Sequence, residues 1–423
     1  MKYEEYKLKN GAKLILVPSN ETKAVSVMAI FGVGSRYESE KINGASHFIE
    51  HLMFKGTEKR PNTLAISKEL DSVGAEFNAM TAKDWTAYYI KIDSEKIDLA
   101  VDVLSDMLLN SKFDENEINR ERGVIVEEIN MYEDNPLMYI EDLLEQCIFD
   151  GNPLGWQISG PREVIKTVSR QELLDYKNAF YQPNNLVIAV SGKFPDDIKE
   201  KIEKAFSFEA TSQEPPEFSK FVFDQTEPKL MIKKQATEQV QLAFGFPGFP
   251  YGDDRVFALY LLAIILGGNM SSRLFINIRE RKGLCYFIRS YINIYKDTGN
   301  LIVQAGLDKN RIKEAISLIL DELKKIRDGR VTEDELKDAK QFLRGKVILH
   351  LEDSSEAAEW FAKQAALTGE ILTPEQKFAL FDKVTVEDVE KVAKEVLLKR
   401  FLNLALIGPF DEGGEDFKKL LEL

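Results

Sequence analysis

Cysteine and histidine are scarce in this sequence, with two and three copies respectively in 423 residues. Cys147 and Cys285 form neither a disulfide framework nor a metal-binding spacing, so we expect two buried free thiols. Long apolar runs are also missing, because residues 259–266 fall far short of the ~20 residues that span a bilayer. Residues 1–6 lack the apolar core of a signal peptide. These absences predict a cytoplasmic protein without a membrane partner.

An excess of basic residues is absent as well. The chain carries 56 Lys and Arg against 70 Asp and Glu, which gives a net charge of −14. Nucleic-acid binding requires clustered positive charge, so this balance argues against a nucleic-acid partner. Hydrophobic residues make up 44% of the chain. That share is enough for substantial cores, and the length favours two large domains.

Two of the three histidines stand four residues apart, in the run His47-Phe48-Ile49-Glu50-His51. On a helix, positions i, i+3 and i+4 share one face, so both imidazoles can bind one ion with the Glu50 carboxylate beside it. The run is the inverted zinc-peptidase motif, His-x-x-Glu-His. Neutral imidazoles suit zinc, and a catalytic zinc site needs one more protein ligand and an open position. The alternative is a surface helix with two solvated histidines, which the scarcity of histidine disfavours.

The third ligand must come from elsewhere in the chain. His350 lies in an apolar run at 345–351, where a lone histidine is more simply a helix residue, so we do not assign it to the site. Residues 120–129 predict part of a long helix. On it Glu121 and Glu128 lie about two turns apart, near one face and beside apolar residues. Acidic side chains in such surroundings suggest a buried, charged role, whereas Glu127 fits a solvated face.

Together with the segments at 34–38, 52–57 and 74–81, these motifs resemble the pitrilysin/insulinase family of zinc metallopeptidases over nearly the whole chain. The similarity is to the short two-domain type, that of mitochondrial processing peptidase subunits and their bacterial relatives.

This resemblance implies a role for each motif residue. His47 and His51 bind zinc, Glu128 completes the ligand set 77 positions after His51 (128 − 51), and Glu121 supports the site. Glu50 acts as the general base.

The two halves of the sequence repeat each other. Three pairs of segments match at offsets of 215 or 216 residues: 93–101 with 308–316, 168–173 with 384–389, and 186–192 with 402–408. The second pair predicts helix starts with Ser or Thr as the capping residue. A period this long indicates duplicated domains and not a solenoid.

We therefore expect an α+β fold of two duplicated domains, each a mostly antiparallel sheet packed against helices on one face. The family resemblance implies the same architecture. The expected boundaries are an N-terminal zinc-binding peptidase domain at 1–208, a polar, proline-rich linker at 209–228, and a C-terminal domain at 229–423.

The second half differs from the first in its candidate site residues. Shifting His47 and His51 by 216 gives residues 263–267, which contain no His or Glu, so we predict one zinc ion per chain. By itself, the stretch at 271–286 predicts a charged helix end, a glycine turn and the start of a strand. The resemblance implies in addition that Arg279 and Tyr286, seven residues apart, reach the substrate.

The predicted function is a zinc-dependent endopeptidase that hydrolyses peptides, or unfolded or presequence segments, inside a chamber formed by two chains. The resemblance implies that substrate adds as a strand at 75–81, with Asn78 and Ala79 binding its backbone. We expect a homodimer, or else a heterodimer with a related subunit. The alternatives are a non-catalytic peptide-binding or structural subunit of a peptidase complex, and a zinc hydrolase on another fold.

Overall fold

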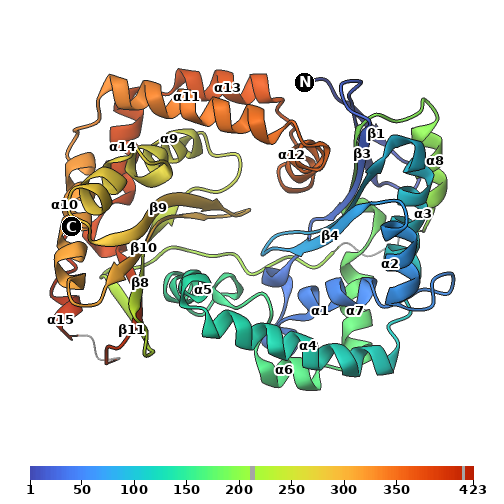
Figure 1. Ribbon diagram of the computed structural model, residues 1–423, viewed down its shortest axis with the longest axis horizontal. Helices are drawn as coiled ribbons and strands as arrows, with labels where there is room; N and C mark the ends of the chain where they lie inside the picture. Colours follow the sequence, from blue (N-terminus) through green and yellow to red (C-terminus); the bar gives the residue numbers. More distant parts are fainter. Residues whose placement is uncertain (210–214, 412–414) are drawn as a thin grey trace. The chain divides into compact units, whose positions relative to one another are not determined.

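The computed structural model describes residues 1–209, 215–411 and 415–423 (Figure 1). Residues 210–214 of the expected linker lie outside this part of the chain. The described residues pack into two compact units, and each is discontinuous in sequence. The first unit comprises Met1–Ile129, Trp156–Ser219 and Lys346–Gln376; the second comprises Asn130–Gly155, Lys220–Gly345 and Lys377–Leu423.

The first unit is built on a six-stranded sheet in which only the β2–β6 pair is parallel. In sheet order its strands are β1 (Glu4–Lys7), β2 (Lys13–Pro18), β6 (Leu186–Gly192), β3 (Ala24–Phe31), β5 (Thr86–Asp93) and β4 (Glu76–Thr81). Its helices are α1 (Ala45–Met53), α2 (Thr63–Asp71), α3 (Ile97–Asn110), α6 (Arg162–Thr167), α7 (Arg170–Phe180), α8 (Ile198–Ala205) and α12 (Ser354–Leu367).

The second unit is built on a five-stranded sheet in which only the β7–β11 pair is parallel. In sheet order its strands are β7 (Lys229–Lys234), β11 (Asn403–Gly408), β8 (Gln239–Gly248), β10 (Gly299–Asp308) and β9 (Cys285–Ile294). Its helices are α5 (Pro136–Ile148), α9 (Arg255–Ala263), the π-helical turns η6 (Ile264–Gly268) and η7 (Phe275–Glu280), α10 (Ile312–Arg327), α14 (Val386–Val396) and α15 (Glu415–Lys418). The unit boundaries in sequence fall within α4 (Glu115–Asp134), α11 (Glu333–His350) and α13 (Pro374–Lys383).

The two sheets share one topology, which confirms the duplication and the predominantly antiparallel α+β fold. Without β1, the order β2-β6-β3-β5-β4 of the first sheet corresponds to β7-β11-β8-β10-β9 of the second. The parallel pairs even agree in register, because Lys13 faces Val187 and Lys229 faces Asn403, an offset of 216 on both strands (229 − 13 and 403 − 187). The predicted helix starts are both present as capping boxes, at Ser169 and at Thr385.

The expectation that helices cover one face of each sheet is wrong, because both faces are covered. In the first unit, Val25 and Val27 of β3 pack into the larger core with α1 and α3. Residues of the opposite parity, such as Met28, pack against α12 through Ala358 and Phe361. β3 is apolar at nearly every position and buried along its length, as strands with two covered faces are.

Helices α5 and α12 occupy matching places in the duplicated sequence, yet each packs on the sheet of the other half (Figure 1). α12 contacts β3 and β6 of the first unit, whereas α5 contacts β8 and β11 of the second. The compact units therefore differ from the division expected at 209–228 by two exchanged segments, 130–155 and 346–376. An amphipathic pattern indicates that a helix has an apolar face, but it does not determine which sheet that face packs against.

No helix in the described part of the chain combines the length and apolarity needed to cross a membrane.

Candidate metal centre

The motif helix α1 begins at a buried carboxylate. Glu38 accepts hydrogen bonds from the backbone N–H groups of Gly44 and Ser46, each at 2.7 Å, and from Asn43 Nδ2 at 2.9 Å. Burial raises the pKa of the Glu38 carboxyl to about 7. Gly44 precedes the helix with φ 99°, and a Cβ there would lie 2.6 Å from the carbonyl oxygen of Ser159, so glycine is required. These contacts fix where α1 starts and which face it turns inward.

His47 and His51 of α1 meet Glu128 of α4. The two imidazole Nε2 atoms lie 3.3 Å apart, and Glu128 Oε2 lies 3.6 Å from His47 Nε2 and 3.5 Å from His51 Nε2. Ligands bound at about 2.0–2.1 Å around a tetrahedral zinc ion lie about 3.3 Å from one another. Within residues 1–209, 215–411 and 415–423 this is the single group of three potential ligands whose atoms converge. The donor set and its spacing therefore fit zinc.

The two histidines differ in protonation. Burial, and then the neighbouring His51, lower the pKa of His47 to about 4. The His47 imidazole is therefore neutral at pH 7 and able to bind a metal ion. Burial also lowers the pKa of His51, but the hydrogen bonds with Glu121 and Glu128 and the negative charges of Glu128 and Glu50 together outweigh burial, and the pKa stands at about 9. A cation at this centre therefore competes with a proton at His51, as is usual for metal ligands.

Glu121 orients His51 from behind. Its Oε2 lies 3.1 Å from His51 Nδ1, and its Oε1 lies 2.7 Å from Lys55 Nζ. Burial raises the pKa of Glu121, but the bonds to His51 and Lys55 outweigh that effect and hold it below its usual value. An ionised Glu121 accepts a hydrogen bond from the His51 Nδ1–H and leaves Nε2 facing the centre. This is the carboxylate–histidine arrangement found behind protein-bound metals.

Glu50 lies on the same face of α1 as His47 and His51, and a residue of the first sheet fixes its carboxylate. Thr81 Oγ1, at the end of β4, donates a hydrogen bond of 2.5 Å to Glu50 Oε2. Burial raises the pKa of the Glu50 carboxyl. A carboxylate with a raised pKa beside a metal centre is suited to accept a proton and release it later.

Two family models match the sequence. The insulinase (peptidase family M16) model covers residues 14–162, and the model for the M16 inactive domain covers residues 167–343. The chain belongs to the M16, or insulinase, family of peptidases. The metal centre lies in the first matched segment, and the second matched segment contains β7, β8, β9 and β10 of the second sheet.

M16 relatives match the chain over nearly its whole length. A zinc protease of Bacillus subtilis, described as uncharacterised, is 35% identical over 411 residues, covering 96% of this chain and 98% of that protein. The crystal structure of a protease from Helicobacter pylori has a TM-score of 0.90 at 24% identity, covering 96% of this chain and 100% of that one. A chain of complex III2 from Candida albicans, with Inz-5 bound, has a TM-score of 0.86 at 18% identity, covering 99% and 100%. At these identities the two structures establish the fold alone.

The remaining predicted residues of this M16 chain lie on two edge strands and a π-helical turn. Asn78 and Ala79 are on β4, which ends the first sheet and pairs with β5 alone. Arg279 lies in η7, with its guanidinium 4.6 Å from the centre of the Phe275 ring. Tyr286, on β9, is 74% exposed.

Tyr286 owes its exposure to a β-bulge. Phe287 pairs with Gly306, and the next pair is Cys285 with Leu307, so Tyr286 is left without a cross-strand partner. Bulges of this kind redirect side chains and are common beside active sites.

His350 and the two cysteines were not assigned to the site, and their surroundings are as follows. His350 is exposed on α11 and lies 3.2 Å from Glu356. Cys147 is buried, as expected, whereas Cys285 is only half-buried.

Sequence reasoning assigned no role to three residues that support the centre: Glu38, Lys55 and Thr81. Glu38 and Lys55 lie in the segments that flank the motif. Lys55 lies beyond the end of α1 at Met53 and contacts Glu121 of α4, so no helical spacing indicated its role. No local pattern indicated Thr81, because its contact with Glu50 depends on how β4 packs on α1.

Proposed function

We propose that this M16 chain is an active zinc endopeptidase that hydrolyses peptides or unfolded segments, including presequences. The observation that carries the proposal is the convergence of His47, His51 and Glu128 at zinc-ligand spacing, with Glu50 beside them on the same helix. A subunit that had lost catalysis would be expected to lose some of these groups, and all of them are present.

Each residue of the site has a chemical task in this proposal. Zinc, when bound by His47, His51 and Glu128, supplies a Lewis acid that polarises the peptide carbonyl and acidifies water. Glu50 takes the proton of the attacking water and passes it to the leaving amine. Glu121 keeps the His51 Nδ1 proton in place and so sets which nitrogen faces the centre. Thr81 holds the Glu50 carboxylate through its hydroxyl.

The substrate backbone would pair with the free edge of β4. This strand ends its sheet, and Thr81 at its C-terminal end contacts Glu50. An extended peptide added to β4, in the segment that contains Asn78 and Ala79, gains main-chain hydrogen bonds whatever its sequence. Such binding suits unfolded chains, because a folded protein has no free strand to add.

We further propose that two chains form a chamber as a homodimer, in which Arg279 and Tyr286 of one protomer serve the centre of its partner. A guanidinium and a phenol are donors suited to a substrate carbonyl or a developing oxyanion. Mixing Glu50→Gln protein with Arg279→Ala protein tests this arrangement. Recovery of activity on mixing supports it, and no recovery at any ratio argues for a single-chain site or for a second, different subunit.

The second candidate function is a non-catalytic subunit of a peptidase complex. The match of residues 167–343 to the family model for the M16 inactive domain favours this candidate. It predicts a protein that binds peptides and leaves them intact.

One experiment separates the two functions. Purified protein, never exposed to a chelator, is analysed for zinc and incubated with a mixed peptide library, with and without EDTA. We expect one zinc per chain and EDTA-sensitive cleavage. A metal-free protein that cannot take up zinc, or a zinc-loaded protein that cuts nothing, would overturn the proposed activity.

A further inference from the structure

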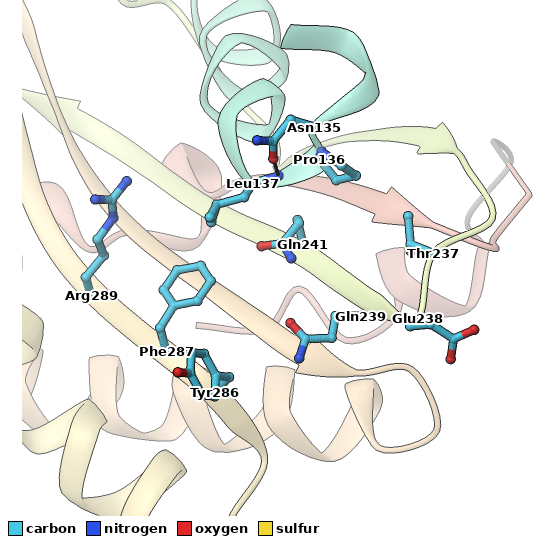
Figure 2. A pocket seen from close by; sticks show the side chains of 10 residues that line it. All are labelled: Asn135, Pro136, Leu137, Thr237, Glu238, Gln239, Gln241, Tyr286, Phe287 and Arg289. Atoms are coloured by element: carbon cyan, nitrogen blue, oxygen red, sulfur yellow. Dashed lines mark hydrogen bonds between the residues drawn. The ribbon is translucent and has the colours of Figure 1, made fainter. Parts of the chain in front are cut away.

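The second unit contains a cavity of about 730 Å³ between the start of α5 and one face of its sheet, where residues of β8 and β9 line it (Figure 2). Pro136 and Leu137 of α5 line one side, and Phe287 and Arg289 of β9 line another. Gln241 of β8 lies between these two walls in Figure 2.

Two features of the backbone make room for this cavity. Gly306 of β10 has no side chain, and a Cβ there would lie 2.7 Å from Phe287 Cε1 and 3.4 Å from Gln241 Nε2. Glycine at this position therefore lets the Phe287 ring and the Gln241 amide spread over the strand. The bulge at Tyr286 adds a second aromatic ring to the lining. The cavity is thus built into the fold of the sheet.

Two oxygens of the lining are buried without a hydrogen bond. Gln241 is only 6% exposed, yet its Oε1 has no partner among the described residues, and the same holds for Thr237 Oγ1. Gln304, on the neighbouring strand, shows the usual state: its Oε1 accepts from Arg289, and its Nε2 donates to the carbonyl of Leu137. Buried polar groups are nearly always paired. The described residues therefore supply no donor for the Gln241 oxygen.

The rest of the lining indicates what kind of group would supply a donor. Leu137, Phe287 and Tyr286 offer apolar and aromatic surface. Arg289 and Glu238 carry opposite charges and lie on opposite sides of Gln241 in Figure 2, so neither sign of charge is favoured at the centre. An apolar body that ends in a neutral N–H or O–H group fits both the walls and the acceptor.

We propose that this cavity is a specificity subsite that takes a substrate side chain with an apolar body and a neutral donor, Tyr or Trp above all. Gln241 is its specificity-determining residue. The inference rests on the endopeptidase function proposed above. Tyr286 lines the cavity and is also assigned to substrate binding in that proposed function, so a peptide side chain is the occupant that the proposal favours. A tyrosine hydroxyl would donate to Gln241 Oε1 while its ring packs on Phe287 and Leu137.

The test compares peptides that differ by one hydroxyl. Blocked peptides with Tyr or Phe scanned through each position are bound to Glu50→Gln protein, in which cleavage is prevented, and binding is followed by fluorescence anisotropy. We expect one position at which Tyr binds roughly tenfold more tightly than Phe, because the unpaired acceptor is costly to leave buried. Gln241→Met in the same background removes that preference. Gln171→Met, the same change at an exposed glutamine of α7, retains it.

A second variant protects the test against misfolding of Gln241→Met. Leu137 is 45% exposed, so Leu137→Trp narrows the cavity from the helix side without disturbing a core. It should weaken the Tyr and Phe peptides together by severalfold at that position. A wild-type protein with no Tyr preference at any position overturns the inference and indicates that water satisfies Gln241. A preference that survives Gln241→Met overturns it as well.

Failure of the proposed endopeptidase function and failure of the subsite give different results in a cleavage assay. Zinc-loaded wild-type protein that cuts no peptide removes the endopeptidase, and the subsite with it. Cleavage that shows no preference dependent on Gln241 removes the subsite alone.

Discussion

The two halves of this molecule share a sheet topology and a strand register, but only one of them brings metal ligands together among the described residues. At the 216-residue offset, His47 and His51 correspond to Ala263 and Gly267. A Cβ at Gly267 would lie 2.5 Å from the backbone nitrogen of Ser290. In the second half, strand backbone therefore occupies the place where a histidine side chain would begin.

The long helices α4 and α11 also differ in whether they carry the acidic residues of a metal site. Aligning the buried residues Ile118 of α4 and Leu336 of α11, an offset of 218 (336 − 118), places Ala339 opposite Glu121 and Lys346 opposite Glu128. The second half thus lacks both the ligand carboxylate and the carboxylate behind it. The comparison teaches that this topology does not by itself make a metal centre. The site needs side-chain space between helix and sheet, and acids on the facing helix.

The largest difference between the halves should appear in catalysis. Glu50→Gln removes the proton acceptor but leaves the three ligands, so cleavage should fall by a factor of about 10²–10⁴ while zinc content and fold are retained. Peptide cleavage assays and metal analysis measure both. Glu333→Gln, at an exposed position of α11, is the matched change in the other half and should leave activity unaltered. Undiminished cleavage by Glu50→Gln protein would remove Glu50 from the mechanism.

The two exchanged helices should, in contrast, be equally necessary. Phe361 of α12 and Leu144 of α5 are both fully buried. Phe361→Ala should lower the free energy of unfolding by about 3–5 kcal/mol and Leu144→Ala by about 2–5 kcal/mol, because each leaves a cavity. Urea denaturation measures the loss, with exposed Leu349→Ala as the control. A loss below about 1 kcal/mol in either variant would show that its helix is not firmly packed on that sheet.

Much of this arrangement could be predicted from the sequence. The helix starts capped by Ser169 and Thr385 and the duplication rest on sequence patterns, and the structure confirms them. The ligand set came from a motif and a family resemblance, and the structure places its three members within reach of one ion. The exchange of α5 and α12 and the role of Thr81 could not be predicted, because they depend on long-range packing that no local pattern encodes.

The two halves also differ at the starts of helices α1 and α9, and the pH dependence of stability tests this difference. Glu38 caps α1 from within the core, whereas Asp254 at the start of α9 makes no side-chain capping bond. Because burial raises the pKa of Glu38 to about 7, its contribution to stability is present below about pH 4.5 and is lost as the pH rises through 7. Relative to Glu38→Gln, the wild type should lose on the order of 3 kcal/mol of unfolding free energy across that range. Denaturant titrations at pH 5 and pH 8 measure the difference. Parallel pH dependence of the two proteins would contradict it.

The smallest expected losses of unfolding free energy come from removing a helix cap, and they should be equal in the two halves. Ser169 and Thr385 cap equivalent helices, α7 and α14, with the same reciprocal bonds. Ser169→Ala and Thr385→Ala should each cost about 1 kcal/mol of unfolding free energy. Thermal or urea unfolding of the two variants provides the measurement. Costs that differ severalfold would show that the two repeats have diverged in stability as well as in chemistry.

The exchange of α5 and α12 has a consequence for biosynthesis. The last strand of the first sheet, β6, ends at Gly192, but the helix that covers its second face begins at Ser354, which leaves 162 residues (354 − 192) still to be made. At ~5–20 residues per second, a ribosome needs roughly 8–30 s to supply them. Throughout that interval the nascent chain presents the bare apolar surface of β3 and β6, which makes this face a natural target for chaperones that act during translation.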